Sequence, residues 1–208
     1  MEFDIETTDQ LLSTTRAVRK RLDFSRPVPR DIITRCLELA VQAPTGGNQQ
    51  GWRWLVIDDA DKRAALADLY RKGGNEYLAG YASQDLDQQT TRVFSSAQYL
   101  ADHLQEAPVH LIPCMPRPEE GTPLVGIGSA FGSIYPAVWS FQLALRARGL
   151  GSALTTLHLI HEKEAAELLG IPDDLMQVAL LPVAYTKGTD FKPANRPPIE
   201  NIIHWNEW

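Results

Sequence analysis

The chain has 208 residues, 44% of them hydrophobic, and a formal net charge of −6 at pH 7. A chain of this size and composition can bury one sizeable core, so we expect a single domain over residues 1–208. The negative net charge argues against general nucleic-acid binding, and any basic pocket is expected to be local.

The first forty residues contain an acidic terminus, a basic turn and a predicted helix. The N-terminus lacks an apolar run, and no later stretch reaches the roughly 18 apolar residues of a membrane span. We therefore expect a cytoplasmic protein without a membrane partner. Arg16 and Arg19 lie three residues apart on one side of a helical turn and can bind an anion together, although a solvated basic turn is the alternative. Apolar residues at helical spacing predict a helix over residues 31–43.

A small polar loop follows that helix at residues 43–52. Pro44 ends the helix, and Gly46 and Gly47 let the backbone approach a flat ligand closely or take positive φ angles. Asn48 and Gln50 offer amide donors and acceptors just before a predicted strand at Arg53–Ile57. A connecting turn with two glycines is the alternative interpretation of this loop.

The rest of the chain alternates predicted helices and strands. The expected helices cover residues 60–70, 133–148 and 162–169, and the expected strands cover residues 108–114 and 176–184. Gly73 and Gly74 are expected to break the first helix, after which a polar, partly helical segment runs to Gln105. Gly149 is expected to close the helix before it and to begin a run of small residues. This alternation, without internal repeats, predicts an α+β sandwich with a mixed sheet.

Several other patterns carry no predicted chemistry. Residues 126–132 look like a dinucleotide fingerprint, but the preceding residues form a poor strand, so we interpret them as a tightly packed helix start. His158 and His161 are expected to be solvated or capping groups, and no metal site is predicted. Cys36 and Cys114 are expected to be buried packing residues without a disulfide.

Four segments, in this order, resemble the FMN-dependent nitroreductase family. They are the basic turn at residues 15–21 with its Pro-Val-Pro step, the loop at 44–52, the small-residue run at 149–156, and the late segment with Leu180–Tyr185 and Arg196-Pro197. The resemblance spans the chain from about Thr14 to Trp205. The chain departs from the family pattern at Ala17, where serine is frequent, and at Gly51, where proline is usual.

The resemblance implies a fold and an assembly. The implied fold is a three-layer α/β/α sandwich with a mixed, mostly antiparallel sheet, in an interlocked homodimer. Residues 73–105 would form a lid over the ligand, and its aromatic residues could stack on a planar acceptor. The tail at residues 197–208 would be exchanged between subunits. Its apolar and aromatic composition favours a homodimer, and a tail that folds back on its own domain is the alternative.

The resemblance also implies an FMN site. Arg16 and Arg196 would hold the phosphate and Arg19 would lie near the pyrimidine edge of the ring. Pro44, Thr45, Gly46 and Asn48 would come from the opposite subunit, and a backbone N–H within residues 149–156 would meet the ring edge. The implied FMN-binding set is Arg16, Ala17, Arg19, Pro44, Thr45, Gly46, Asn48, Gln50, Leu154, Thr155, Thr156 and Arg196. No catalytic side chain is implied, because hydride chemistry belongs to the flavin.

The implied activity is that of an FMN-dependent oxidoreductase. It would take hydride from NADH or NADPH and reduce nitroaromatics, quinones or similar small planar acceptors in a ping-pong cycle. Two alternatives stay open on the sequence. One is a flavin-binding carrier or sensor without turnover, and the other is a specialised reaction of the superfamily such as reductive dehalogenation.

Overall fold

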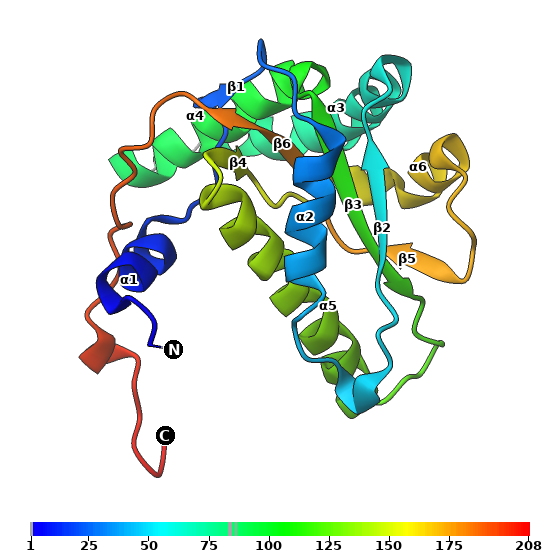
Figure 1. Ribbon diagram of the computed structural model, residues 1–208. Coiled ribbons are helices and arrows are strands. Elements are labelled where there is room, and N and C mark those ends of the chain that lie inside the picture. The colour runs from blue at the N-terminus through cyan, green and yellow to red at the C-terminus, as the bar shows by residue number, and fades with distance from the viewer. Residues whose placement is uncertain (1, 83–84, 86) are drawn as a thin grey trace.

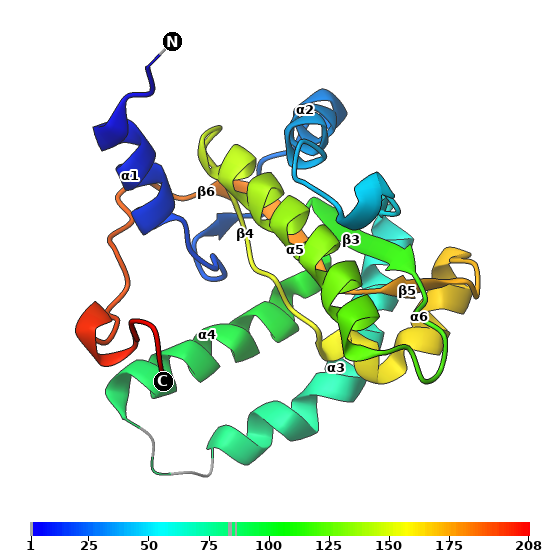
Figure 2. The same cartoon turned by 90° about the horizontal axis from the view of Figure 1, so that it is seen from below.

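The protein folds around a six-stranded sheet that is covered by helices on both faces. The computed structural model describes residues 2–82, 85 and 87–208 (Figures 1 and 2). The strands are β1 (Leu22–Asp23), β2 (Arg53–Ile57), β3 (Val109–Pro116), β4 (Leu150–Ser152), β5 (Leu175–Gln177) and β6 (Leu181–Thr186). The helices are α1 (Ile5–Thr14), α2 (Arg30–Ala40), α3 (Ala60–Ala82), α4 (Gln88–His103), α5 (Leu124–Arg146) and α6 (Glu162–Leu169).

The sheet is built on antiparallel pairs, with β3 at its centre. Its main path runs β1-β6-β3-β2, while β4 also pairs with β6 and β5 with β3. The register sets Val109 opposite Val183 and Leu111 opposite Leu181. The parallel element in the described chain is an isolated bridge between Ala17 and Ser152. The predicted α+β class and the mostly antiparallel sheet are therefore confirmed.

Alternation along β3 explains the layers. Val109, Leu111 and Met115 belong to a core with α2 and α5, whereas Ile112 and Cys114 belong to a second core with α3 and α4. Successive residues of a strand point to opposite faces, so a strand that is apolar throughout is buried on both. The α2–α5 layer and the α3–α4 layer accordingly lie on opposite sides of the sheet (Figure 1). Both cysteines are buried and free, as expected.

Helix α3 departs from its predicted end. The sequence predicted a break at Gly73 and Gly74, but α3 runs through both of them to Ala82. A Cβ at Gly73 would lie 2.9 Å from Ile160 Cβ, and one at Gly74 would lie 2.8 Å from Leu157 Cδ1. The two glycines therefore serve close packing against the short 3-10 helix Leu157–His161, and this packing outweighs their low helix propensity.

Helix α5 also begins earlier than predicted. Residues 126–132 form its first turns, so the helix starts at Leu124 and ends at Arg146, where Gly149 follows with a positive φ of 73°. Among the described residues, α5 is long and apolar enough to cross a membrane by length and composition alone, which the sequence analysis did not expect. Its buried face, which includes Phe141 and Leu145, packs in the core beside α2 and the sheet.

The predicted strand at residues 176–184 is divided in two. β5 pairs with the far end of β3 and β6 with its beginning. Between them, Val178 donates its N–H to Pro113 and Leu180 exchanges two backbone hydrogen bonds with Thr155. The apolar run could not reveal this shift, because residues 177–184 are buried throughout. Helix α6 ends at Leu169, as predicted, and Gly170 follows it in the left-handed conformation.

The expectation for His158 is wrong. His158 and His110 are both fully buried, and His110 Nε2 donates to the Leu104 carbonyl at 2.9 Å. Neither ring nitrogen of His158 has a hydrogen-bond partner within the part of the chain that the structure describes. Burial is the largest cause that lowers the pKa of each histidine to about 4. Both rings are therefore neutral in the fold at pH 7.

These two histidines predict a loss of stability in mild acid. Because each folded pKa of about 4 lies below the ordinary value of 6.5, the unfolded chain binds more protons between these values. The free energy of unfolding should be highest above pH 6.5 and should fall toward pH 4, by at most about 1.4 kcal/mol per pH unit for each histidine. Urea titrations between pH 7.5 and 5 measure this slope.

A variant comparison assigns the slope to the buried rings. His158→Asn should make the dependence shallower, whereas His204→Asn, at an exposed position, should leave it unchanged. The carboxylates of Asp58 and Asp190 have pKa values held below 3.8 by hydrogen bonds to Arg30 and Arg21, so they titrate outside this pH range. An unchanged slope in His158→Asn would contradict the assignment.

Candidate functional site

The basic turn between α1 and β1 is fixed against the sheet. Val18 donates its N–H to the Ser152 carbonyl at 2.8 Å, and its side chain is buried. Its neighbours therefore point outward, with Arg16 and Ala17 exposed and Arg19 half-buried. Arg16 Nη1 donates to the carbonyl of Lys192 at 3.0 Å, which ties the late segment of the chain to this turn.

The predicted phosphate residues lie together. Arg16, Ala17, Arg19 and Arg196 line one cavity of about 640 Å³, although Arg196 is 180 positions further along the chain than Arg16. Gln89 and Val93 of α4 and Trp139 of α5 also line the cavity, and the sequence analysis did not identify them. The sequence pattern could not identify them, because residues of these types on helices usually pack in the core or face solvent.

The charge of this cavity is not balanced. Within the described residues, Arg16, Arg19 and Arg196 form no ion pair, in contrast to Arg21 beside them, which pairs with Asp190 at 2.5 Å. Burial is the main cause that lowers the pKa of Arg19. A guanidinium still carries its charge after such a change, because its ordinary pKa exceeds 12. Three cationic side chains around one cavity, without carboxylate partners, form a site suited to an anion.

The small-residue run forms a wall beside the basic turn. β4 carries it from Leu150 to Ser152, and a Cβ at Gly151 would meet Thr186 Cγ2 at 2.8 Å, so this approach requires glycine. Thr155 then exchanges two hydrogen bonds with Leu180, at 3.0 and 2.8 Å. The neighbouring Leu154 and Thr156 are both exposed.

The loop at residues 44–50 lies in a different part of the fold from the basic turn. Gly46 donates its N–H to Ser133 Oγ at 3.0 Å, and a Cβ on Gly46 would lie 2.1 Å from Ser129 Oγ. The loop is thus held to the first half of α5, whereas Arg146 at the end of α5 reaches Thr14 of α1 at 3.4 Å. Figure 1 shows this separation. Asn48 and Gln50 both have positive φ and are joined by a side-chain hydrogen bond of 2.9 Å.

Within one chain, therefore, the predicted site is split. Arg16, Ala17, Arg19 and Arg196 share a cavity, while Thr45 and Gln50 line a second cavity of about 210 Å³ beside α5. Pro44 and Asn48, which are exposed, and the half-buried Gly46 belong to the same loop as this second cavity and do not line the basic one. The sequence analysis expected this loop to act from the opposite subunit.

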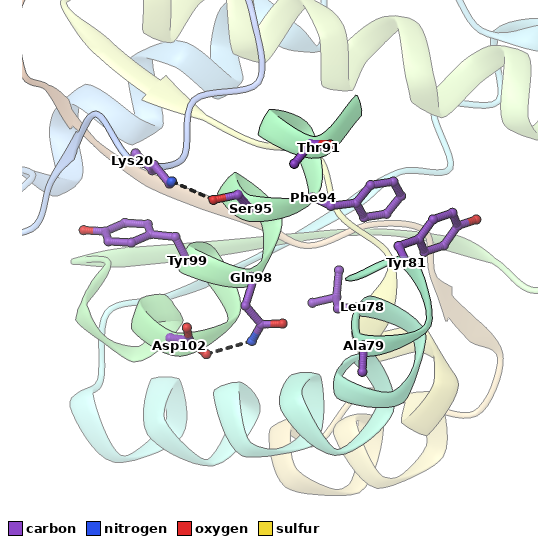
Figure 3. A pocket seen from close by; sticks show the side chains of 10 residues that line it. All are labelled: Lys20, Leu78, Ala79, Tyr81, Thr91, Phe94, Ser95, Gln98, Tyr99 and Asp102. Carbon is purple, nitrogen blue, oxygen red and sulfur yellow. Dashed lines mark hydrogen bonds between the residues drawn. The ribbon is translucent and has the colours of Figure 1, made fainter. Parts of the chain in front are cut away.

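The predicted lid is a pair of helices. α3 and α4 line a cavity of about 550 Å³ together with Lys20 of the basic turn, whose Nζ donates to Ser95 Oγ at 3.0 Å (Figure 3). Tyr81 and Phe94 stack with ring centroids 3.9 Å apart. Residues 83, 84 and 86 of the predicted lid lie outside the described part. Among the described residues, no group of three or more histidine, cysteine or acidic side chains is arranged to hold a metal.

Comparison with known proteins gives a family match over most of the chain. A family model described as "Nitroreductase family" matches residues 12–185. An iodotyrosine deiodinase of Thermotoga neapolitana is 28% identical over 198 residues, covering 94% of this chain and 96% of that protein. A 5,6-dimethylbenzimidazole synthase of Rhodospirillum rubrum is 27% identical over 168 residues, covering 77% and 74%. An NADH dehydrogenase of Thermus thermophilus is 25% identical over 215 residues, covering 97% and 100%.

Solved structures share the fold. An iodotyrosine deiodinase bound to FMN and 3-iodo-L-tyrosine superposes with a TM-score of 0.72 at 23% identity, covering 95% of this chain and 98% of that one. An FMN- and NADPH-dependent nitroreductase, NfnB from a Sphigopyxis strain, gives a TM-score of 0.67 at 22% identity, covering 96% and 99%. Identities this low establish the architecture and leave the substrate open.

Proposed function

Because the chain belongs to the nitroreductase family of flavin oxidoreductases, we propose that it binds FMN in the arginine cavity and reduces planar aromatic acceptors with hydride from NADH or NADPH. The observation that carries the proposal is the convergence of Arg16, Arg19 and Arg196 on one cavity without carboxylate partners. A phosphate monoester carries between one and two negative charges near neutral pH, and guanidinium groups bind it through paired hydrogen bonds.

In this proposal, each group of residues around the cavity has a separate role in binding FMN. Arg16 and Arg196, both exposed, hold the phosphate at the open side. Arg19 lies deeper, where its fixed charge favours a ring that has gained electrons. The exposed backbone around Leu154 and Thr156 offers N–H donors to the ring edge. Bound FMN supplies the hydride chemistry itself, and the protein contributes binding, orientation and exclusion of water.

We propose that the active form is a homodimer. Residues 44–50 are held to the first half of α5 and do not line the arginine cavity of their own chain. The exposed face of α5 carries Leu124, Gly128, Gly132 and Trp139, and the side chains of Leu124 and Trp139 are 84% and 42% exposed. A second copy that packs on this apolar face would bury it and would bring its own loop toward the cavity.

The tail supports the same assembly. Between residues 197 and 208, the side chains of Ile199, Ile202, Trp205 and Trp208 are all more than half exposed. A tail with this composition gains stability when another surface covers it. We propose that the tail packs on the partner subunit, in a cytoplasmic protein with neither a nucleic-acid nor a membrane partner.

The acceptor is proposed from the lid. Tyr77, Tyr81 and Phe94 form a continuous aromatic set, with centroid distances of 5.0 and 3.9 Å. Such a set favours flat, electron-poor rings such as quinones and nitroaromatics. Reductive dehalogenation is the second candidate, because the deiodinase of T. neapolitana matches over 94% of the chain. The predicted lid, residues 73–105, contains no lysine. Lys72, directly before it, forms an ion pair with Glu164 at 2.9 Å.

Turnover separates an enzyme from a flavin carrier. Consumption of NADH and NADPH should be measured in steady state with a benzoquinone, with nitrofurazone and with 3-iodotyrosine as acceptors. The proposal expects parallel-line kinetics with the quinone and the nitro compound, as in a ping-pong cycle. Bound FMN with negligible turnover on every acceptor would instead support the carrier or sensor. Activity with 3-iodotyrosine alone would support dehalogenation.

A further inference from the structure

Tyr70 carries a buried hydroxyl that no part of the proposed site yet uses. It lies in α3, and its side chain is 1% exposed within the core beneath the small-residue run. A buried phenol usually finds a hydrogen-bond partner, and here the Tyr70 hydroxyl lies 2.8 Å from Thr155 Oγ1. Thr155 belongs to the backbone segment that we place against the flavin, so this bond joins the core of the protein to the wall of the cofactor site.

The Thr155 side chain is held from two directions. Its backbone N–H and carbonyl are both engaged by Leu180, at 3.0 and 2.8 Å, so the residue cannot rotate out of the wall. Its hydroxyl oxygen is fixed by Tyr70. Thr155 is nevertheless partly exposed, between the exposed Leu154 and Thr156. A hydroxyl has one proton and two lone pairs, so Thr155 can accept from Tyr70 and still donate to a ligand.

The chemistry of the two hydroxyls favours one direction for this bond. Arg19 is half-buried beside Tyr70, and in the described chain its one hydrogen bond is a long one, 3.4 Å from Nη1 to Ser96 Oγ. Burial raises the pKa of Tyr70, while the bond to Thr155 and the charge of Arg19 act in the opposite sense. The phenol therefore keeps its proton. A phenol is also more acidic than an aliphatic hydroxyl, so Tyr70 is the better donor of the pair and Thr155 the acceptor.

We propose that Tyr70 is a positioning residue, which donates to Thr155 Oγ1 and thereby orients the Thr155 hydroxyl as a hydrogen-bond donor to the cofactor. This inference rests on the proposed FMN site. The proposed chain of hydrogen bonds runs from Tyr70 to Thr155 and ends at the ligand. A donor of this kind binds a reduced, electron-rich ring more strongly than an oxidised one, so it should raise the reduction potential of bound FMN.

Substitutions that remove single oxygen atoms test the proposal. Tyr70→Phe and Thr155→Val should each lower the potential of bound FMN. The expected size is a threefold to tenfold loss in the equilibrium constant for reduction, roughly the worth of one neutral hydrogen bond. Since both act through one donor, the double variant should match Thr155→Val alone. Thr155→Ser, which keeps the hydroxyl, should retain most of the parent potential. Tyr185→Phe removes the same atom from a ring that packs under Arg26, and should change nothing.

The measurements are the midpoint potential of the bound flavin by dye equilibration, the FMN affinity of the apoprotein and the melting temperature. A Tyr70→Phe protein that melts earlier but keeps its potential would reduce Tyr70 to a packing residue and overturn the inference. Additive shifts in the double variant would overturn it as well. If the parent chain failed to bind FMN, the proposed function would fall first, and this inference with it.

Discussion

Arg16→Ala should weaken FMN binding by roughly tenfold to a hundredfold, on the scale of one hydrogen-bonded charge pair of about 1.5–3 kcal/mol. Arg16 is exposed and lines the cavity together with Arg196, from the far end of the chain. Arg196→Ala should have an effect of similar size, and the double variant should be purified without flavin. Titration of the apoprotein with FMN, followed by quenching of flavin fluorescence, gives the dissociation constants.

Riboflavin makes the phosphate assignment specific. It has the same ring as FMN but no phosphate, so Arg16→Ala and Arg196→Ala should leave its affinity nearly unchanged. Arg35→Ala is the matched control, since Arg35 is an exposed arginine on α2 whose charge pairs with Glu38 at 2.7 Å. If Arg196→Ala held FMN as tightly as the parent, or weakened riboflavin equally, the phosphate assignment would be wrong.

Gly132→Glu should convert the protein into a monomer that does not retain FMN. Nothing lies within 4 Å of a Cβ built at Gly132, so the fold of one chain accommodates the new side chain. In a helix interior, replacing glycine also adds a few tenths of a kcal/mol or more of helix propensity. A second copy packed on this face of α5, however, would meet a buried and unpaired carboxylate, which costs several kcal/mol.

Light scattering after size exclusion, together with the flavin content of each peak, measures both effects. Ala64→Glu places the same charge at an exposed position of α3 and should leave mass and flavin unchanged. A Gly132→Glu protein that remained dimeric with full flavin would refute the α5 interface. A monomeric parent protein with full flavin would show that one chain completes the site alone.

The sequence was sufficient where local chemistry decides the structure. The strand Arg53–Ile57 and the helix Glu162–Leu169 were predicted with their observed bounds. The predicted end of α3 at Gly73 and Gly74 was wrong because glycine occurs in two structural contexts. It can end a helix, or it can admit a neighbouring segment, and the neighbour at residues 157–161 is close in space but not in sequence.

The same limit applies to the site. The grouping of Arg16, Arg19 and Arg196 came from family resemblance, since nothing local links residue 16 to residue 196. The structure adds the contact between Arg16 and Lys192, and the core support of Thr155 by Tyr70. Tyr70 could not be predicted, because a tyrosine at helical spacing is usually a packing residue. His158 was misjudged because a polar residue in a short loop gives no sign of its burial.

The most direct test of the central claim is the visible absorption spectrum of the purified protein, recorded before and after anaerobic addition of NADPH or NADH. The account predicts a yellow protein with flavin bands, which bleach with a nicotinamide nucleotide and from which denaturation releases FMN. A colourless protein that cannot be reconstituted with FMN would contradict the account. The arginine cavity would then be assigned to another anionic ligand.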